Sequence, residues 1–136
     1  MRIVLDSSVT LSWVYSDEQS ATAQALLDRV VQHGASVPSL WRVEVANALV
    51  MAVRRRRIAP TFRDEALRDL ALLDIAIDPG CDEQAWSATI RLADLYALTA
   101  YGAAYLELAQ RLRLPLATLD SALTSAAQGA GVEVLA

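Results

Sequence analysis

Short apolar runs recur along this chain, and stretches with helical periodicity separate them. The first run, Ile3-Val4-Leu5, ends at Asp6, and its length suits a strand that is buried on both faces. Strands that alternate with helices form parallel sheets covered by helices. We therefore predict an α/β fold with a central parallel sheet of four to five short strands, in one domain spanning residues 1–136. The predicted strands are 3–5, 35–37, 75–77, 116–119 and 132–135.

The helices are predicted from apolar spacing and from capping residues at their ends. Ser7 and Ser8 are expected to cap the first helix, Ser39 is expected to cap the helix that carries Glu44, and Gly102 is expected to start a later one. The principal predicted helices are 9–15, 20–33, 39–57, 82–96, 102–113 and 121–128.

The composition supports a folded core, because 54% of the residues are apolar and 21% are charged. One cysteine, Cys81, excludes an internal disulfide, and all 12 basic residues are arginines. The first residues lack the pattern of a signal peptide, and no apolar run approaches the ~20 residues of a membrane helix. We expect a soluble, cytoplasmic protein with no membrane contact.

Three acidic residues are expected to meet at one edge of the sheet. Asp6 follows the first strand, Asp120 follows the fourth, and Glu44 lies in the second turn of the helix after the second strand. Ligands of open α/β sheets bind outside the carboxyl ends of the strands. Carboxylates crowded there repel one another, and a divalent cation such as Mg²⁺ or Mn²⁺ would relieve that repulsion.

The same acids also have a simpler interpretation. An aspartate after a strand is often a helix cap or a turn residue, and a chain with 16 acidic residues places some at strand ends by chance. Spacing by itself leaves both interpretations open.

Three segments of the chain resemble the PIN domain, specifically the VapC-type ribonuclease toxins of bacterial toxin–antitoxin pairs. The segments are VLDSSVTLSWVYSDE, PSLWRVEVANAL and LTAYGAAYLELAQRLRLPLATLDSAL. The segments occur in the order of the family, and the resemblance extends over nearly the whole chain. The resemblance implies a three-layer sandwich with a central parallel sheet.

The resemblance also implies a function and a site. The function is a Mg²⁺- or Mn²⁺-dependent endoribonuclease, with Asp6, Glu44 and Asp120 as metal-site acids. Thr118 would orient the site, and Ser7 would contribute a nearby hydroxyl. The implied partners are an RNA substrate and a small cognate antitoxin, in a homodimer or a toxin–antitoxin hetero-oligomer.

One position departs from the family pattern T-x-Y-D-A-x-Y. This chain has Thr99-Ala100-Tyr101-Gly102-Ala103-Ala104-Tyr105, so Gly102 occupies the position of the remaining site aspartate. Glycine supplies no oxygen ligand. We therefore expect an impaired nuclease, and the alternative is an inactive PIN-fold module that binds an antitoxin or RNA without cleavage.

The other candidate residues favour structural roles. Arg42 is the best placed arginine for contact with an RNA phosphate. Trp86 lies in an apolar stripe and is expected to pack in the core or at an interface. Glu107 and Asp94 are expected to be structural or solvent-facing. The absence of lysine argues against receiver domains and haloacid-dehalogenase-type phosphatases. LDSSVT is not the glycine-rich turn of a dinucleotide site, and His33, the single histidine, lies at a predicted helix end.

Overall fold

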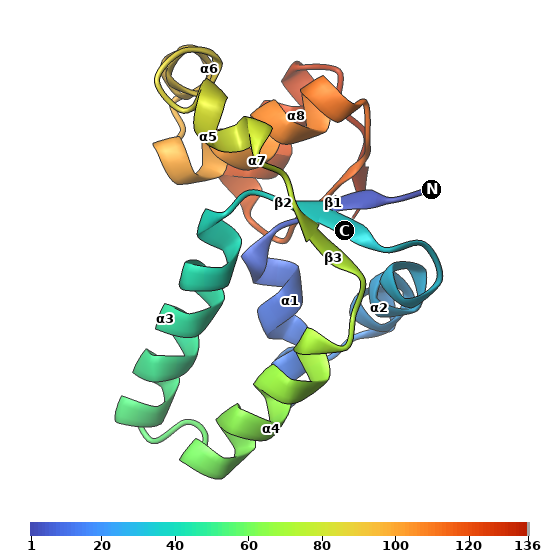
Figure 1. Cartoon of the computed structure of the whole chain (residues 1–136), viewed down its shortest axis with the longest axis vertical. Helices are drawn as coiled ribbons and strands as arrows, with labels where there is room; N and C mark the ends of the chain where they lie inside the picture. The colour runs from blue at the N-terminus through green and yellow to red at the C-terminus, as the bar shows by residue number, and fades with distance from the viewer. Residues whose placement is uncertain (136) are drawn as a thin grey trace.

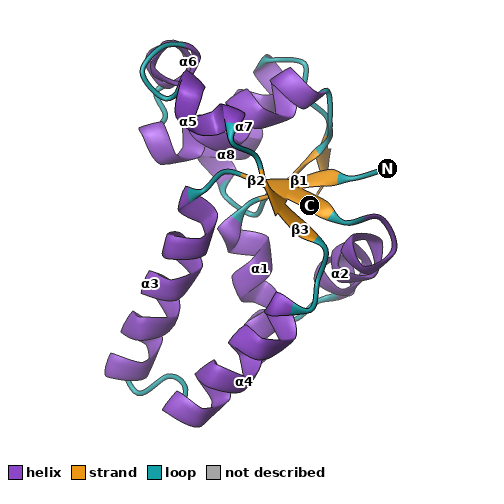
Figure 2. Ribbon diagram, viewed as in Figure 1, coloured by secondary structure: helices purple, strands orange, loops and turns teal. Residues whose placement is uncertain are grey.

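The computed structural model describes residues 1–135, and its centre is a five-stranded parallel sheet. The strand order is β3-β2-β1-β4-β5, and every neighbouring pair is parallel. Figure 2 shows β1, β2 and β3 at the centre of the molecule, between two groups of helices. The predicted α/β fold is thereby confirmed. The strands are β1 (Ile3–Leu5), β2 (Ala35–Val37), β3 (Ile75–Ile77), β4 (Leu116–Ala117) and β5 (Val134–Leu135).

Helices cover both faces of the sheet (Figure 1), with α1–α4 on one face and α5–α8 on the other. Parallel strands are joined by right-handed crossovers, so the direction of travel across the sheet decides the face. The chain moves one way from β1 to β3 and the opposite way from β3 to β5. The helical elements are α1 (Ser7–Val14), the 3-10 turn η1 (Ser16–Glu18), α2 (Ala21–His33), α3 (Leu40–Arg54), α4 (Pro60–Ala71), α5 (Gly80–Gln84), α6 (Ala88–Tyr96), α7 (Ala100–Leu112) and α8 (Ser121–Gly129).

The hydrophobic core lies around the middle of the sheet. Every residue of β1 is fully buried, and β2 is buried along its whole length. The edge strand β3 differs, because Ala76 and Ile77 are exposed. None of the helices within residues 1–135 has the length and apolar character needed to cross a membrane.

Several predicted helix ends were wrong. Ser7 and Ser8 lie inside α1, and the residue before the helix is Asp6. Ser39 precedes α3 but its hydroxyl donates to Asp82 at 2.9 Å rather than capping the helix. The helix predicted over residues 82–96 is two helices, because the backbone at Ser87 (φ −125°, ψ −91°) leaves the helical region between α5 and α6.

The start of α7 also differs from its prediction. Thr99 is the N-cap, and its hydroxyl accepts a hydrogen bond from the Gly102 N–H at 3.1 Å. Gly102 is therefore the third residue of the helix and not its start. In capping boxes this third position carries an acidic or amide side chain.

Candidate active site

A cleft opens at the carboxyl ends of β1 and β4, where the sheet topology reverses. The chain leaves β1 toward β2 and leaves β4 toward β5, so the two following connections diverge to opposite faces. Such switch points are where open α/β sheets bind ligands. The cleft has a volume of about 400 Å³, and we call it the acid cleft; it is lined by Asp6, Ser7, Ser8, Leu11, Glu44, Leu98, Thr99, Tyr101, Gly102, Tyr105, Asp120, Ala122 and Leu123.

Asp6 lies deepest among the acids of the cleft, with 6% of its surface exposed. Its Oδ2 atom accepts hydrogen bonds from the Ser8 hydroxyl at 2.6 Å and from the Thr118 hydroxyl at 2.8 Å. Both donors are neutral, so the carboxylate is held in place without being neutralised. A buried carboxylate of this kind favours a cation as a further partner.

The two hydroxyls also fix the loop that follows β4. Thr118 Oγ1 accepts from the Asp120 N–H at 3.0 Å, and Ser8 Oγ accepts from the Leu119 N–H at 2.9 Å. The loop bearing Asp120 is thereby tied to Asp6 through two side chains. Thr118 lies where the sequence predicted an orienting hydroxyl, whereas Ser8 was expected only as a cap. The run Asp6-Ser7-Ser8 is the sequence feature that could have indicated this role of Ser8.

Glu44 enters the cleft from α3 and is half-buried. Its Oε1 atom accepts a hydrogen bond from the hydroxyl of Tyr105 at 2.5 Å, and Tyr105 is 1% exposed on α7. Ser7 lies beside this pair. Burial raises the pKa of Glu44, and hydrogen bonding by the Ser7 side chain offsets part of that rise. Tyr105 was missed as a site residue because an aromatic side chain on a helical stripe ordinarily packs in the core, which its ring does here.

The carboxylates of the cleft influence one another. Burial raises the pKa of Asp6, the Ser8 and Thr118 hydroxyls partly offset that shift, and the charge of Asp120 adds to it. Burial likewise raises the pKa of Glu44, the Tyr105 hydrogen bond opposes the shift, and the charge of Asp6 reinforces it. The three acids therefore share one electrostatic environment, with Asp6 between the other two.

Asp120 belongs both to the acid cleft and to a helix cap. It lines the acid cleft, and its Oδ1 atom accepts from the Leu123 N–H at 2.9 Å as the N-cap of α8. The simpler interpretation as a helix cap is therefore correct for one oxygen, and the other oxygen has no role in the cap.

Gly102 lines the same cleft on the first turn of α7. A Cβ atom added there would meet only the Thr99 hydroxyl, at 3.7 Å, which is an ordinary contact. Space thus exists for a side chain, and the backbone conformation does not require glycine. What the cleft lacks at this position is a carboxylate.

The acids fit a divalent cation only in part. Within residues 1–135, no three His, Cys, Asp or Glu side chains are gathered closely enough to form a ready ligand set. Mg²⁺, however, commonly binds through one or two carboxylates and keeps several waters. Asp6 with Asp120 or with Glu44 meets that requirement, and Gly102, which lines the same cleft, has no side chain that could bind an ion.

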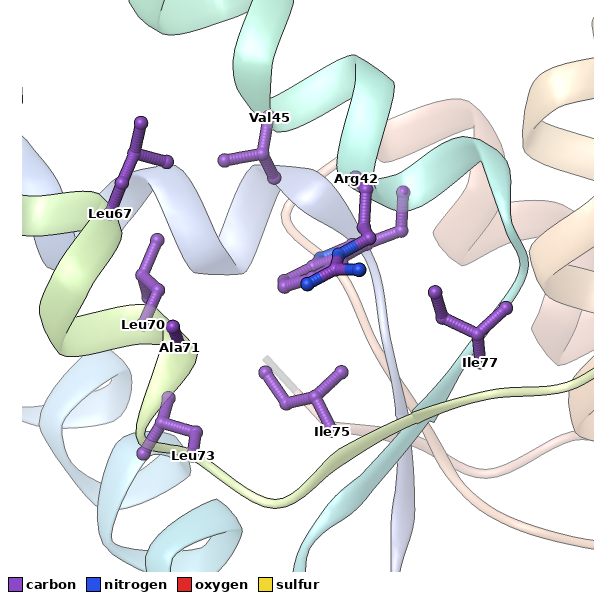
Figure 3. A pocket seen from close by; sticks show the side chains of 9 residues that line it. Arg42, Val45, Leu67, Leu70, Ala71, Leu73, Ile75 and Ile77 are labelled. Carbon is purple, nitrogen blue, oxygen red and sulfur yellow. The ribbon is translucent and has the colours of Figure 1, made fainter. Parts of the chain in front are cut away.

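Arg42 does not line the acid cleft. It lies in a separate pocket between α3, α4 and β3, where Figure 3 shows its guanidinium among apolar side chains. That pocket is lined by Trp41, Arg42, Val45, Leu67, Leu70, Ala71, Leu73, Ile75 and Ile77. The predicted phosphate contact has no support from this placement, because residues 42 and 44 point to different sides of α3.

A second acidic group lies further along α7, outside the acid cleft. Glu107 is 4% exposed, and both of its carboxylate oxygens accept from Arg111 Nε, at 2.9 and 3.1 Å. Arg111 also pairs with Asp78 at 3.1 Å. Its Nη2 atom lies 3.6 Å from Cys81 Sγ, and burial raises the pKa of that thiol to about 12. These residues connect α7 to the loop after β3.

Two further expectations have clear outcomes. Glu107 is structural, as predicted, and Asp94 is exposed. Trp86 was predicted to pack in the core or at an interface. The core half of that prediction was wrong, because Trp86 lies in the break between α5 and α6 and 92% of its surface is exposed, whereas packing at an interface stays a prediction.

Comparisons with known proteins agree with this geometry. The sequence model of the PIN domain family matches residues 3–129. The chain is also similar in structure to PAE2754 from Pyrobaculum aerophilum, with a TM-score of 0.65 and 21% sequence identity, over 99% of this chain and 90% of that one. At that identity the likeness concerns the fold. No curated protein sequence matches the chain.

Proposed function

This chain belongs to the PIN domain family, whose members are typically metal-dependent nucleases, and from that premise we propose that it is an Mg²⁺- or Mn²⁺-dependent endoribonuclease impaired by Gly102. The observation that carries the proposal is the acid cleft. Asp6, Glu44 and Asp120 line one cavity at the switch point of the sheet, and hydroxyls but no cationic side chain hold Asp6 and Glu44 in place.

The proposed reaction is hydrolysis of an RNA phosphodiester, in which water adds to phosphorus and the bond to one sugar oxygen breaks. Asp6, Glu44 and Asp120 would hold the divalent ion. When bound, the ion would supply a lowered pKa for the attacking water and neutralisation of charge on the phosphate. Thr118 and Ser8 keep Asp6 in position, and Tyr105 keeps Glu44 in position.

The impairment follows from the first turn of α7. A carboxylate at position 102 would be a further ligand, and its absence weakens the hold on the ion. A misplacement of roughly 1 Å costs about 10²-fold in rate. We expect Gly102→Asp to increase Mn²⁺-dependent RNA cleavage by about that factor.

The matched control for this test is Gly102→Asn. Asparagine has nearly the shape of aspartate and can cap the helix in the same way, but it brings no charge. Cleavage by the Asp variant alone supports the ligand role. Equal, robust rates for the wild-type chain and Gly102→Asp would contradict the proposed impairment. No cleavage by any of the three proteins would contradict the proposed nuclease activity.

Gly102 and the incomplete ligand set also favour a second candidate. The chain is then a PIN-fold module that binds a cognate antitoxin or RNA without cutting it. The pocket between α3, α4 and β3 is a candidate contact for a protein partner, because apolar side chains surround the Arg42 guanidinium there (Figure 3). Calorimetry with Mn²⁺ separates the two candidates, since binding favours the enzyme and no binding favours the module.

The proposed biological role is that of a toxin in a toxin–antitoxin pair, assembled as a homodimer or with its antitoxin. The antitoxin would approach the acid cleft with a basic side chain, which would supply the positive charge that Asp6, Glu44 and Asp120 lack. Induced expression of Gly102→Asp should then arrest growth of a bacterial host more strongly than expression of the wild-type chain. Equal growth of the two cultures would argue against the toxin role.

A further inference from the structure

One exposed aromatic side chain lines the acid cleft. Tyr101 is 64% exposed on the first turn of α7, next to Gly102. Two other aromatic residues among 1–135 are strongly exposed, Phe62 at 44% and Trp86 at 92%, and neither lines this cleft. Tyr105, the second tyrosine of the cleft, is buried and its hydroxyl is bound to Glu44. The Tyr101 ring is therefore the aromatic face that this cleft presents to solvent.

The charges around the cleft limit how it can hold an RNA strand. Among the described residues that line it, none is arginine or histidine, and three are acids. The whole chain carries a net charge of −4. Attraction to phosphates, which dominates most nucleic-acid binding, is therefore weak here unless a cation is bound. Additional binding affinity has to come from groups that contact an uncharged part of the nucleotide.

Bases are flat and uncharged, and they stack on aromatic side chains irrespective of their sequence. Tyr101 is one residue from the position that faces the proposed metal site, and Leu98 and Leu11 line the same cleft. We propose that the Tyr101 ring is a stacking platform for one unpaired base of an RNA strand whose phosphate approaches the divalent ion that Asp6, Glu44 and Asp120 would hold. Tyr101 is thus a positioning residue, and the inference rests on the proposed nuclease function.

The stacking role favours single-stranded RNA over a duplex. A base inside an A-form helix has both faces covered by its neighbours, so only an unpaired or extruded base can lie on the ring. The same strand in duplex form should bind more weakly to the wild-type chain and should be insensitive to Tyr101.

The test measures binding, so it does not depend on cleavage. The probe is a short fluorescent single-stranded RNA, and its dissociation constant is measured by anisotropy with Mg²⁺ present, with the RNA checked for integrity afterwards. Tyr101→Ala should weaken binding by roughly 5- to 100-fold, the range for loss of one stacked base. Tyr101→Phe keeps the ring and should bind like wild type. Trp86→Ala, the matched control for an exposed aromatic residue, should have no effect.

A second arm replaces single nucleotides of the probe by abasic ones. One such replacement should weaken binding to the wild-type chain as much as Tyr101→Ala does, and the two changes together should cost no more than either alone. Tyr101→Ala is on an exposed first helical turn, and unchanged thermal unfolding will show that it folds.

The failures are distinguishable. Unchanged RNA binding by Tyr101→Ala, with wild-type binding intact, overturns the stacking role only and leaves the ring as a surface for a protein partner. Equal weakening by Tyr101→Phe and Tyr101→Ala also overturns it, because the hydroxyl would then be the contact. Absence of RNA binding by the wild-type chain overturns both the inference and the proposed nuclease.

Discussion

Helix α7 contributes to two groups of acidic residues, and the negative charge is compensated by an arginine in one group but not in the other. Glu107 is neutralised by Arg111, which pairs with Asp78 as well. Two residues earlier in the same helix, Tyr105 faces the acid cleft, where Asp6 and Glu44 receive hydrogen bonds from hydroxyls. One group is complete within the chain, and the other lacks a positive partner.

The difference between the two groups indicates where an external cation would bind. A buried carboxylate without a positive partner is costly, and its pKa rises as a result. The pKa values of Asp6 and Glu44 are raised in this way. The Glu107 group shows that this fold can place an arginine beside an acid where one is needed. The absence of such an arginine from the acid cleft is one reason why we propose that cleft as the functional site.

The largest expected effect comes from breaking the complete group. Arg111→Ala leaves Glu107 buried and unpaired, and should reduce the free energy of unfolding by on the order of 3 kcal/mol. This is the lower end of the range for buried pairs, since 31% of the Arg111 side chain is exposed. Urea unfolding measures the loss. Arg91→Ala, at an exposed position of α6, is the control, and equal losses in the two variants would contradict the structural role.

The second prediction adds the partner that the acid cleft lacks. Mn²⁺ at about ten times its dissociation constant should raise the free energy of unfolding by about 1.4 kcal/mol, because it binds only the folded chain. Thermal unfolding with and without Mn²⁺ measures the shift. Asp6→Asn should abolish it, whereas Asp94→Asn, an exposed position of α6, should leave it unchanged. A shift that survives in Asp6→Asn would place the ion elsewhere.

The third prediction concerns pH in the absence of metal. Because the pKa values of Asp6 and Glu44 are raised in the folded chain, the folded state holds more protons than the unfolded state between the ordinary and the raised values. The contribution of these two groups to the free energy of unfolding therefore falls as pH rises through that window. Asp6→Asn should flatten this fall in urea titrations that begin near the ordinary carboxylate pKa of about 4 and proceed to higher pH, and Mn²⁺ should oppose the fall. An unchanged pH profile in Asp6→Asn would contradict the raised pKa.

The smallest expected effect tests whether glycine at position 102 is needed for the fold or matters only for ion binding. Gly102→Ala should stabilise the chain by about 0.5–1 kcal/mol, because alanine loses less backbone freedom in a helix and the added Cβ has room. It should leave Mn²⁺ binding unchanged, since methyl supplies no ligand. Gly34→Ala is the contrast, because Gly34 has φ +77° and its Cβ would collide with Arg2 and Asp74. Destabilisation by Gly102→Ala would show that glycine is needed for the fold.

Much of the molecule could be predicted from local pattern. The runs before Asp6 and after Gly34 gave correct strands because parallel strands buried on both faces need short, continuous apolar segments. Helix ends were less predictable. Thr99 rather than Gly102 caps α7, because a threonine hydroxyl can accept the Gly102 N–H and a glycine has no side chain with which to do so.

Residue types and strand direction were enough to predict the parallel sheet and the convergence of Asp6, Glu44 and Asp120 at one edge of it. The resemblance to the PIN family, and not the residue pattern, implied that a carboxylate is missing at Gly102. Which acids are compensated could be seen only in the folded chain. The hydroxyls of Ser8, Thr118 and Tyr105, and the guanidinium of Arg111, reach their partners across 2, 112, 61 and 4 residues of sequence respectively. The longest of these contacts exist only once the packed strands and helices bring the partners together, because hydrogen bonds act over about 3 Å.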